Sequence, residues 1–284
     1  MSSGVAPATL IPGIRLTSVF PRTKRNSDFI KPPMDFLSIH FKIVVMTRVY
    51  HIVKFQDGNA YLLFDGCNWR CKYCVWREVT RWSLCLPEKT RQQLDYLWKE
   101  RKVRYLTVEE VERILEKERV KIAFLGGGEP TLDPELKPLM KALAKRGIKV
   151  WLVTNGEGLD DEIVDIAYGI TFSIKALDEE LHKRITGVSN SKVLENFRRY
   201  AKSGKIVAET VYVPGLVECE EIMKIAEFIA SINPNIALRI DPLVQGADLE
   251  EVDKCIEKVK NVLNAYRIKV KGEVKPPKLL YPVV

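Results

Sequence analysis

The sequence lacks several features that would place it in other classes of protein. No apolar run in its 284 residues reaches the roughly 18 residues of a transmembrane helix, so we expect no membrane partner. Histidine is scarce, with only His40, His51 and His182 in the whole chain. The hydrophobic share of 46% and the charged share of 29% exclude a largely disordered chain.

Acidic residues are missing from the start of the chain, where none precedes Asp28. Residues 1–45 hold six basic and two acidic residues and show no sustained helical or strand period. We expect a flexible or mis-started extension, with Met46 opening the first regular pattern. A transit or signal segment is the alternative, although a continuous apolar stretch is missing. The rest divides into a core domain over 46–270 and a C-terminal tail over 271–284.

From residue 46 onward, short β-branched runs alternate with longer amphipathic segments. The pattern predicts strands at 49–55, 59–65, 121–125, 148–153, 169–174, 206–213 and 236–241. It predicts helices at 89–102, 107–117, 134–146, 160–167, 178–185, 191–203, 218–231 and 248–265. Strands such as "IKVWLV" suit burial on both faces of a parallel sheet. We therefore predict an α/β fold of six strand–helix units, too few for an eightfold barrel but enough for a partial (β/α)6 TIM-like barrel.

The loop after the strand at 59–65 holds a compact group of cysteines. Cys67, Cys71 and Cys74 are spaced C-x3-C-x2-C, so their thiolates can turn toward one metal centre and leave one coordination position open. The alternatives are a zinc site that borrows a fourth ligand and, less favoured because three close cysteines cannot pair evenly, disulfide bonds. The remaining cysteines lack short spacing and are interpreted as buried or incidental thiols: Cys85, Cys219 and Cys255.

This cysteine loop, with the aromatic Tyr73 before its last cysteine, resembles the signature of the radical S-adenosylmethionine (radical SAM) enzymes. In that family three thiolates bind a 4Fe–4S cluster, and the amino and carboxylate groups of SAM chelate the fourth iron. A second element resembles the family's G-G-E-P motif, whose carboxylate can meet a ligand ammonium group. It consists of Gly127, Gly128, Glu129 and Pro130. The resemblance implies a partial barrel of the radical SAM type, with both cofactors.

Further motifs are similar to those of the pyruvate formate-lyase activating enzyme group, which acts on glycyl-radical proteins. Thr154 and Asn155 match a T-N-G element that helps to hold SAM. Lys175 matches a lysine placed to meet the SAM carboxylate. Val213 matches a turn near the nucleoside, and Asp241 ends the strand whose backbone approaches the adenine. By the same resemblance, Tyr73 packs beside the adenine.

The sequence departs from that group at two positions. Val153 and Ser173 stand where the activating enzymes carry carboxylates that contribute to a monovalent-cation site beside SAM. We expect this cation site to be absent or differently built, while Ser173 remains a candidate for the SAM site by its position. The group's histidine near the nucleoside has no counterpart, since His182 lies on a predicted helix and is interpreted as solvent-facing.

The segment 75–106 is interpreted as an insertion after the cluster loop. It contains Trp76, Trp82 and Trp98 among several Lys and Arg residues. Tryptophan and arginine favour a recognition surface, here for a protein or a small molecule. The favoured interpretation, however, is a helical hairpin that packs its tryptophans and exposes its charges. Nucleic acid is not the expected partner, because acidic residues balance the basic ones and no RNA-binding module is present.

The resemblance implies an enzyme that cleaves SAM reductively to a 5′-deoxyadenosyl radical, which abstracts hydrogen from a substrate such as a glycyl-radical protein. It further implies a one-electron donor of the flavodoxin or ferredoxin type. Modification of a small metabolite or RNA is an alternative, and a non-catalytic zinc-binding module is an alternative of a different class. An oxygen-labile cluster predicts a reducing, cytoplasmic setting, and we expect a monomer.

Overall fold

The computed structural model describes residues 45–244, 246–269 and 275–284, which belong to one compact unit. The extension predicted at 1–45 falls outside the described residues, except for Val45. The described strands form a single open sheet in the order β8-β7-β6-β5-β4-β3-β2-β1-β9. The predicted α/β fold with a partial barrel is thus confirmed.

Six consecutive strands of this sheet run parallel, which matches the number of strand–helix units predicted. They are β2 (Ala60–Phe64), β3 (Ile122–Gly127), β4 (Lys149–Thr154), β5 (Gly169–Ser173), β6 (Ile206–Tyr212) and β7 (Leu238–Pro242). A short β8 (Ala265–Tyr266) continues the parallel order. At the other edge, β1 (Val49–Lys54) pairs antiparallel with both β2 and β9 (Lys278–Tyr281).

Eight α-helices are described, each overlapping a predicted helix. They are α1 (Glu88–Lys99), α2 (Val108–Lys117), α3 (Leu136–Lys145), α4 (Asp161–Ile166), α5 (Glu179–Thr186), α6 (Ser191–Tyr200), α7 (Cys219–Ile232) and α8 (Leu249–Val259). The start of α2 shows how sequence fixes a boundary. The Thr107 hydroxyl accepts from the Glu110 amide at 3.2 Å, and the Glu110 carboxylate accepts from the Thr107 amide at 2.9 Å. This capping box satisfies two amides that the helix itself leaves unpaired.

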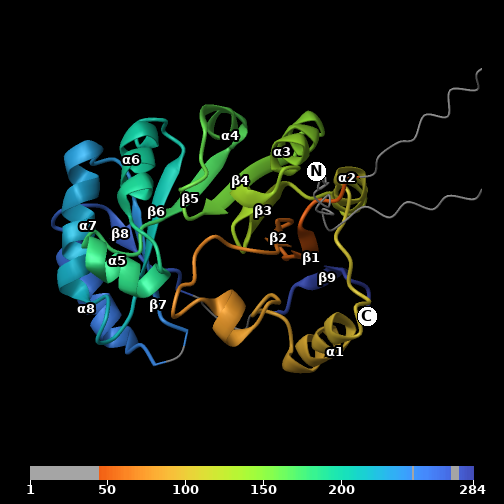
Figure 1. Cartoon of the computed structure of the whole chain (residues 1–284), viewed down its shortest axis with the longest axis horizontal. Coiled ribbons are helices and arrows are strands. Elements are labelled where there is room, and N and C mark those ends of the chain that lie inside the picture. The colour runs from red at the N-terminus through yellow and green to blue at the C-terminus, as the bar shows by residue number, and fades with distance from the viewer. Residues whose placement is uncertain (1–44, 245, 270–274) are drawn as a thin grey trace, which may run out of the picture. The chain divides into compact units, whose positions relative to one another are not determined.

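The register of the parallel strands separates a core face from a cavity face. Leu62, Leu125, Leu152 and Ile170 are neighbours across four strands and are fully buried. They belong to a core cluster that includes apolar residues of α3, α4 and α7, and Figure 1 shows α3, α4 and α6 along one side of the strands. Because side chains alternate along a strand, the residues between these point to the opposite face.

The insertion is not a helical hairpin. It consists of a π-helical turn, η1 (Val75–Val79), an irregular stretch and the single helix α1. A second apolar cluster holds it against β1 and β2. In this cluster Trp82 contacts Tyr50 and Trp98 edge-on, with ring centroids 5.6 and 5.9 Å apart, and its indole N–H donates to Asp95 at 2.8 Å. The tryptophans therefore do pack, but around an irregular chain rather than between two helices.

Two further differences from the predictions lie near the C-terminus. The helix predicted to reach residue 265 ends at Val259, and β8 begins at Ala265. The segment 271–284 was expected to be only a tail, yet β9 lies within it and pairs with β1. A four-residue edge strand leaves little signal in the sequence, because its pairing partner lies more than 200 residues away.

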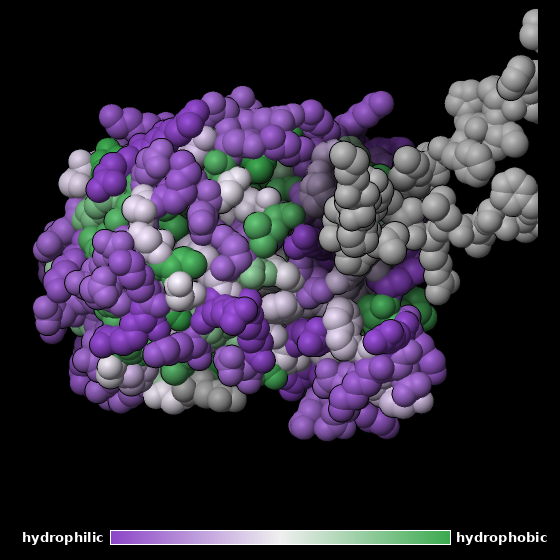
Figure 2. All heavy atoms as spheres, in the orientation of Figure 1, coloured by the Kyte–Doolittle hydropathy of each residue, from purple (hydrophilic) through white to green (hydrophobic). Residues whose placement is uncertain are grey.

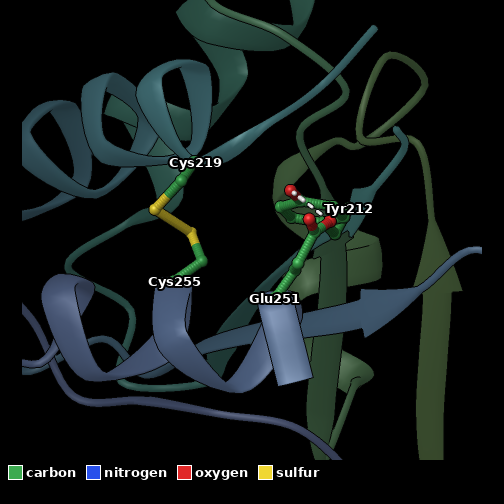
Figure 3. Close-up of a disulfide and its surroundings, with 4 residues drawn as sticks. All are labelled: Tyr212, Cys219, Glu251 and Cys255. Atoms are coloured by element: carbon green, nitrogen blue, oxygen red, sulfur yellow. Dashed lines mark hydrogen bonds between the residues drawn. A yellow bond between two sulfur atoms is a disulfide. The ribbon is translucent and has the colours of Figure 1, made fainter. Parts of the chain in front are cut away.

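Cys219 and Cys255 are not incidental thiols, because they form a disulfide (Figure 3). Cys219 begins α7 and Cys255 lies on α8, with their Cα atoms 5.3 Å apart. They are separated by 36 positions in the sequence, over which the chain returns through β7, so that the two helices become neighbours. That proximity comes from the fold and not from cysteine spacing. Cys85 is an exposed free thiol.

No helix among the described residues is long and apolar enough to cross a membrane. On the face seen in Figure 2, hydrophilic residues cover most of the surface, and hydrophobic residues occur in small separate areas.

Candidate functional site

A cavity of about 530 Å³ lies at the carboxyl ends of the parallel strands. Twelve of the fourteen predicted site residues line it: Cys67, Cys71, Tyr73, Cys74, Gly127, Gly128, Glu129, Thr154, Asn155, Ser173, Lys175 and Asp241. Pro130 and Val213 do not line it. Pro130 begins the short helix η2 (Pro130–Leu132) after Glu129. Val213 is buried and bridges to the buried Val217 across an exposed turn. The twelve residues thus come from four strand ends and one loop to a single cavity.

The three clustered cysteines are free thiols on the wall of this cavity. Burial raises the pKa of Cys67 to about 11. Burial also raises the pKa of Cys71, and the positive charge of Lys175 lowers it only in part. The Trp69 amide lies 3.4 Å from Cys67 Sγ and can donate to it. Partly buried thiols with raised pKa values favour the protonated form unless a metal ion replaces the proton.

The glycine turn after β3 packs directly on the start of the cysteine loop. The amides of Gly128 and Glu129 donate to the carbonyls of Phe64 and Gly66 at 2.9 and 2.8 Å. A Cβ atom on Gly128 would lie 2.1 Å from the Gly66 carbonyl oxygen. Gly127 has a φ of +95°, in the region that glycine adopts without strain. No larger residue fits this contact, and the two motifs are therefore held together backbone to backbone.

Glu129 fastens the end of β3 to the end of β4. Its carboxylate accepts from the Thr131 hydroxyl at 2.6 Å, the Thr154 hydroxyl at 2.7 Å and the Asn155 amide at 2.8 Å. Burial raises the pKa of Glu129, and these hydrogen bonds act against that rise. The carboxylate predicted to meet the SAM ammonium group is therefore already engaged by the protein, although it still borders the cavity.

A largely buried group of charges lies just after β5, on β6 and on β7. Lys175 Nζ lies 3.1 Å from Glu209 Oε1, and the Ser173 hydroxyl donates to Glu209 Oε2 at 2.7 Å. Arg239 Nε donates to Asp241 Oδ2 at 3.0 Å. Burial lowers the pKa of Lys175, but the carboxylate of Glu209 more than reverses this and raises it overall. The lysine therefore stays protonated, and each cation has an acidic neighbour.

Sequence reasoning missed Glu209 and Arg239, which also line the cavity. Each is a charged residue between uncharged neighbours in a mostly apolar strand, in "VAETVYV" and "ALRIDP", and that contrast was the available signal. Ser173 and Glu209 are register partners on neighbouring strands. Glu209 thus places a carboxylate beside Ser173.

His182 is not solvent-facing, as had been predicted, but 1% exposed. Its Nδ1 lies 2.9 Å from the Val188 carbonyl oxygen, and its ring meets Trp69 edge-on at 5.1 Å between centroids. Burial lowers the pKa of His182. The helix α5 turns this residue inward onto the cysteine loop, which a helical pattern without its packing partner could not indicate.

The residues present fit a 4Fe–4S cluster and SAM. Three thiols line one cavity beside a glycine turn that leaves the backbone accessible, and the buried hydroxyl of Tyr73 on the same wall has no hydrogen-bond partner in the described structure.

Three clustered cysteine thiols face a cavity at the strand ends of a partial β/α barrel. This arrangement is typical of a class of metallocofactor enzymes. Residues 61–229 match the family described as "Radical SAM superfamily", and the chain belongs to that superfamily. Members of this superfamily use a 4Fe–4S cluster and SAM, so the chain is an enzyme with these cofactors.

The chain is also similar to individual proteins. It is 31% identical over 176 residues to the "Putative glycyl-radical enzyme activating enzyme" of Methanocaldococcus jannaschii, covering 60% of this chain and 62% of the relative. It is 28% identical over 166 residues to pyruvate formate-lyase 1-activating enzyme of Escherichia coli, covering 54% and 60%. The chain thus spans less than two thirds of the length of these relatives.

Among solved structures, the chain resembles Streptococcus suis SuiB bound to S-adenosylmethionine. The TM-score is 0.54 at 20% identity, and the match covers 72% of this chain and 48% of SuiB. At this identity the likeness concerns the fold alone, and it supports the partial barrel described above.

Proposed function

We propose that Cys67, Cys71 and Cys74 bind the 4Fe–4S cluster and that SAM occupies the neighbouring cavity. The observation that carries this proposal is that three thiols, the glycine turn and Lys175 border one cavity although they come from separate strand ends. When bound, the reduced cluster supplies one electron that cleaves SAM to methionine and a 5′-deoxyadenosyl radical, which takes a hydrogen atom from the substrate and becomes 5′-deoxyadenosine.

The protein's own residues bind and orient these groups. Lys175 offers a protonated ammonium group for the SAM carboxylate, because Glu209 keeps it charged in a buried setting. Tyr73 offers its ring for stacking and its unpartnered hydroxyl for a hydrogen bond. Trp76 and Trp82 line the cavity from the insertion and exclude water from the place where the radical forms.

We propose a protein substrate, as the names of the two curated relatives suggest. Leu84 and Val244 support this choice, since both line the cavity and are 39% and 50% exposed, which gives the opening apolar edges that a peptide segment can contact. A small-molecule substrate is the second candidate, because aromatic side chains of the insertion line the cavity. The electron donor would be a flavodoxin or ferredoxin, and the chain would act as a monomer in the cytoplasm, with residues 46–270 as the active domain.

The cofactor proposal is tested by anaerobic reconstitution with iron and sulfide. We expect about four irons per chain and visible absorbance from charge transfer between thiolate and iron. The electron paramagnetic resonance spectrum of the reduced protein should change when SAM is added. A colourless protein that instead takes up one zinc ion would overturn the proposal and favour the structural zinc module.

The substrate proposal needs a partner protein. Candidate glycyl-radical proteins are mixed with reduced enzyme and SAM, and a glycyl radical doublet is sought by electron paramagnetic resonance. SAM cleavage that depends on a small metabolite, with no protein-based radical, would instead support the second candidate.

A further inference from the structure

Glu157 lies one residue beyond the T-N-G element and belongs to no motif identified in the sequence. Its Oε2 accepts from Asn68 Nδ2 and from Trp69 Nε1, each at 2.7 Å. Asn68 and Trp69 directly follow Cys67 in the cysteine loop. We infer that Glu157 is a positioning residue that holds this loop, and with it the thiol of Cys67, in the geometry for the cluster. The inference rests on the proposed function of the three cysteines.

The turn that carries Glu157 is itself tightly fixed. Gly156 has a φ of +79°, and a Cβ atom there would lie 2.1 Å from the Phe172 ring. The side-chain amide of Asn196, which is 2% exposed, donates to the carbonyls of both Gly156 and Glu157 at 2.9 Å. Helix α6 and strand β5 therefore fix the position of the Glu157 carboxylate independently of the cysteine loop.

Trp69 connects this carboxylate to the first cysteine. It is 2% exposed, with its ring against His182 and its indole N–H on Glu157. Its backbone amide lies 3.4 Å from Cys67 Sγ. Hydrogen bonds to cysteine sulfur are among the interactions that tune an iron–sulfur cluster, and groups that orient metal ligands affect metal affinity strongly. Fixing the indole thus also fixes the amide that faces the sulfur.

The loop has a second attachment that does not involve Glu157. The amides of Arg70 and Lys72 donate to the carbonyls of Thr186 and Ile185, at 2.8 and 3.0 Å, at the end of α5. Asn155 Nδ2 also donates to Asn68 Oδ1 at 2.8 Å. Removal of the Glu157 carboxylate therefore leaves these attachments intact. We expect a Glu157→Ala variant to fold with a loosened segment between Cys67 and Cys71.

The test uses two readouts that do not depend on turnover. In the apoprotein, hydrogen exchange of residues 67–71 should be about tenfold faster in Glu157→Ala than in wild type. In the reconstituted protein, iron loss to a chelator should be about tenfold faster, the lower end of the range known for such outer residues. Glu157→Gln keeps an acceptor oxygen and should recover most of the protection.

Two further variants sharpen the test. Trp69→Phe keeps the ring and removes the indole N–H, so it should change both readouts in the same direction. The double variant Trp69→Phe with Glu157→Ala should change each readout by less than the sum of the two single effects, because both substitutions remove the hydrogen bond between the indole and the carboxylate. Glu180→Gln is the control, since this carboxylate is 84% exposed and does not line the cavity. It should match wild type.

Wild-type rates in Glu157→Ala for both readouts would overturn the inference. Faster exchange without faster iron loss would overturn it as well, because the loop would then be held without consequence for the cluster. A wild type that binds no cluster would instead refute the proposed function, and the positioning of the loop would still be decided by the exchange of the apoprotein.

Discussion

The cavity has two walls of different construction. One, the strand wall, consists of the cysteine loop and the ends of β3 to β7, where strand register places side chains such as the pairs Ser173 with Glu209 and Val211 with Asp241. The other, the insertion wall, runs from the π-helical turn η1 through the irregular stretch to Cys85, and an aromatic cluster holds it against β1 and β2. We therefore expect changes in the first wall to remove cofactors, and changes in the second to alter stability and access.

The largest difference is expected between two cysteines that border the same cavity. Cys71→Ala removes a proposed cluster ligand, so iron content after reconstitution should fall to near zero and SAM cleavage should disappear. Cys85→Ala is the matched control, because Cys85 lies in the insertion wall and outside the motif. Its iron content, measured by the same colorimetric assay, should equal that of wild type. Equal iron loss in both variants would remove the distinction between the walls.

Within the insertion wall, Trp82→Ala should have the largest effect on folding. Trp82 is 2% exposed, and its indole N–H donates to Asp95. Loss of such a ring costs about 3–5 kcal/mol of unfolding free energy, measured by urea denaturation. Trp82→Phe, which keeps much of the volume, should cost less. A cost below 1 kcal/mol for Trp82→Ala would show that the aromatic cluster does not hold this wall.

On the outer side of the strand wall, the disulfide between α7 and α8 can be removed by the double change Cys219→Ala and Cys255→Ala. Closing a loop of 36 residues restricts the unfolded chain, so its loss should lower stability by roughly 2–4 kcal/mol. Thermal unfolding with and without reductant provides the measurement. The variant should be insensitive to reductant, and equal sensitivity in both proteins would contradict this account.

The smallest effect is expected where the insertion joins α2. Hydrogen bonds from Arg104 hold the pKa of Glu110 at about 2, below the value near 4.3 of an unfolded glutamate. A carboxylate with a lowered pKa stabilises the fold above about pH 4.3 and loses this effect as pH falls toward 2. Glu110→Gln should cost about 1 kcal/mol at pH 7.

This cost is measured as the difference in unfolding free energy between the variant and wild type over a pH series. It should shrink steadily between about pH 4 and pH 2. A difference that stays constant with pH would mean that the capping geometry, and not the charge of Glu110, determines the stability of this junction.

The same contrast explains what could be predicted from sequence. The cysteine spacing, the glycine turn and the amphipathic period are local signals, so the strand wall and twelve of its residues followed from them. The irregular path of 75–87, the strand β9 and the inward turn of His182 depend on contacts between distant segments. Glu209 left a signal, a charge in a mostly apolar strand, but its partners Ser173 and Lys175 come from another part of the chain. Glu157 left none, because its role shows only when the cysteine loop is placed beside it.

The central claim is that a cluster held by the three cysteines cleaves SAM bound in the cavity at the strand ends. Its most direct test is to reduce the reconstituted protein anaerobically with excess SAM and quantify methionine and 5′-deoxyadenosine by chromatography. The account predicts that both products form in equal amounts in wild type and that neither forms in Cys71→Ala. A wild type that carries the cluster, binds SAM and yet forms no 5′-deoxyadenosine would contradict it.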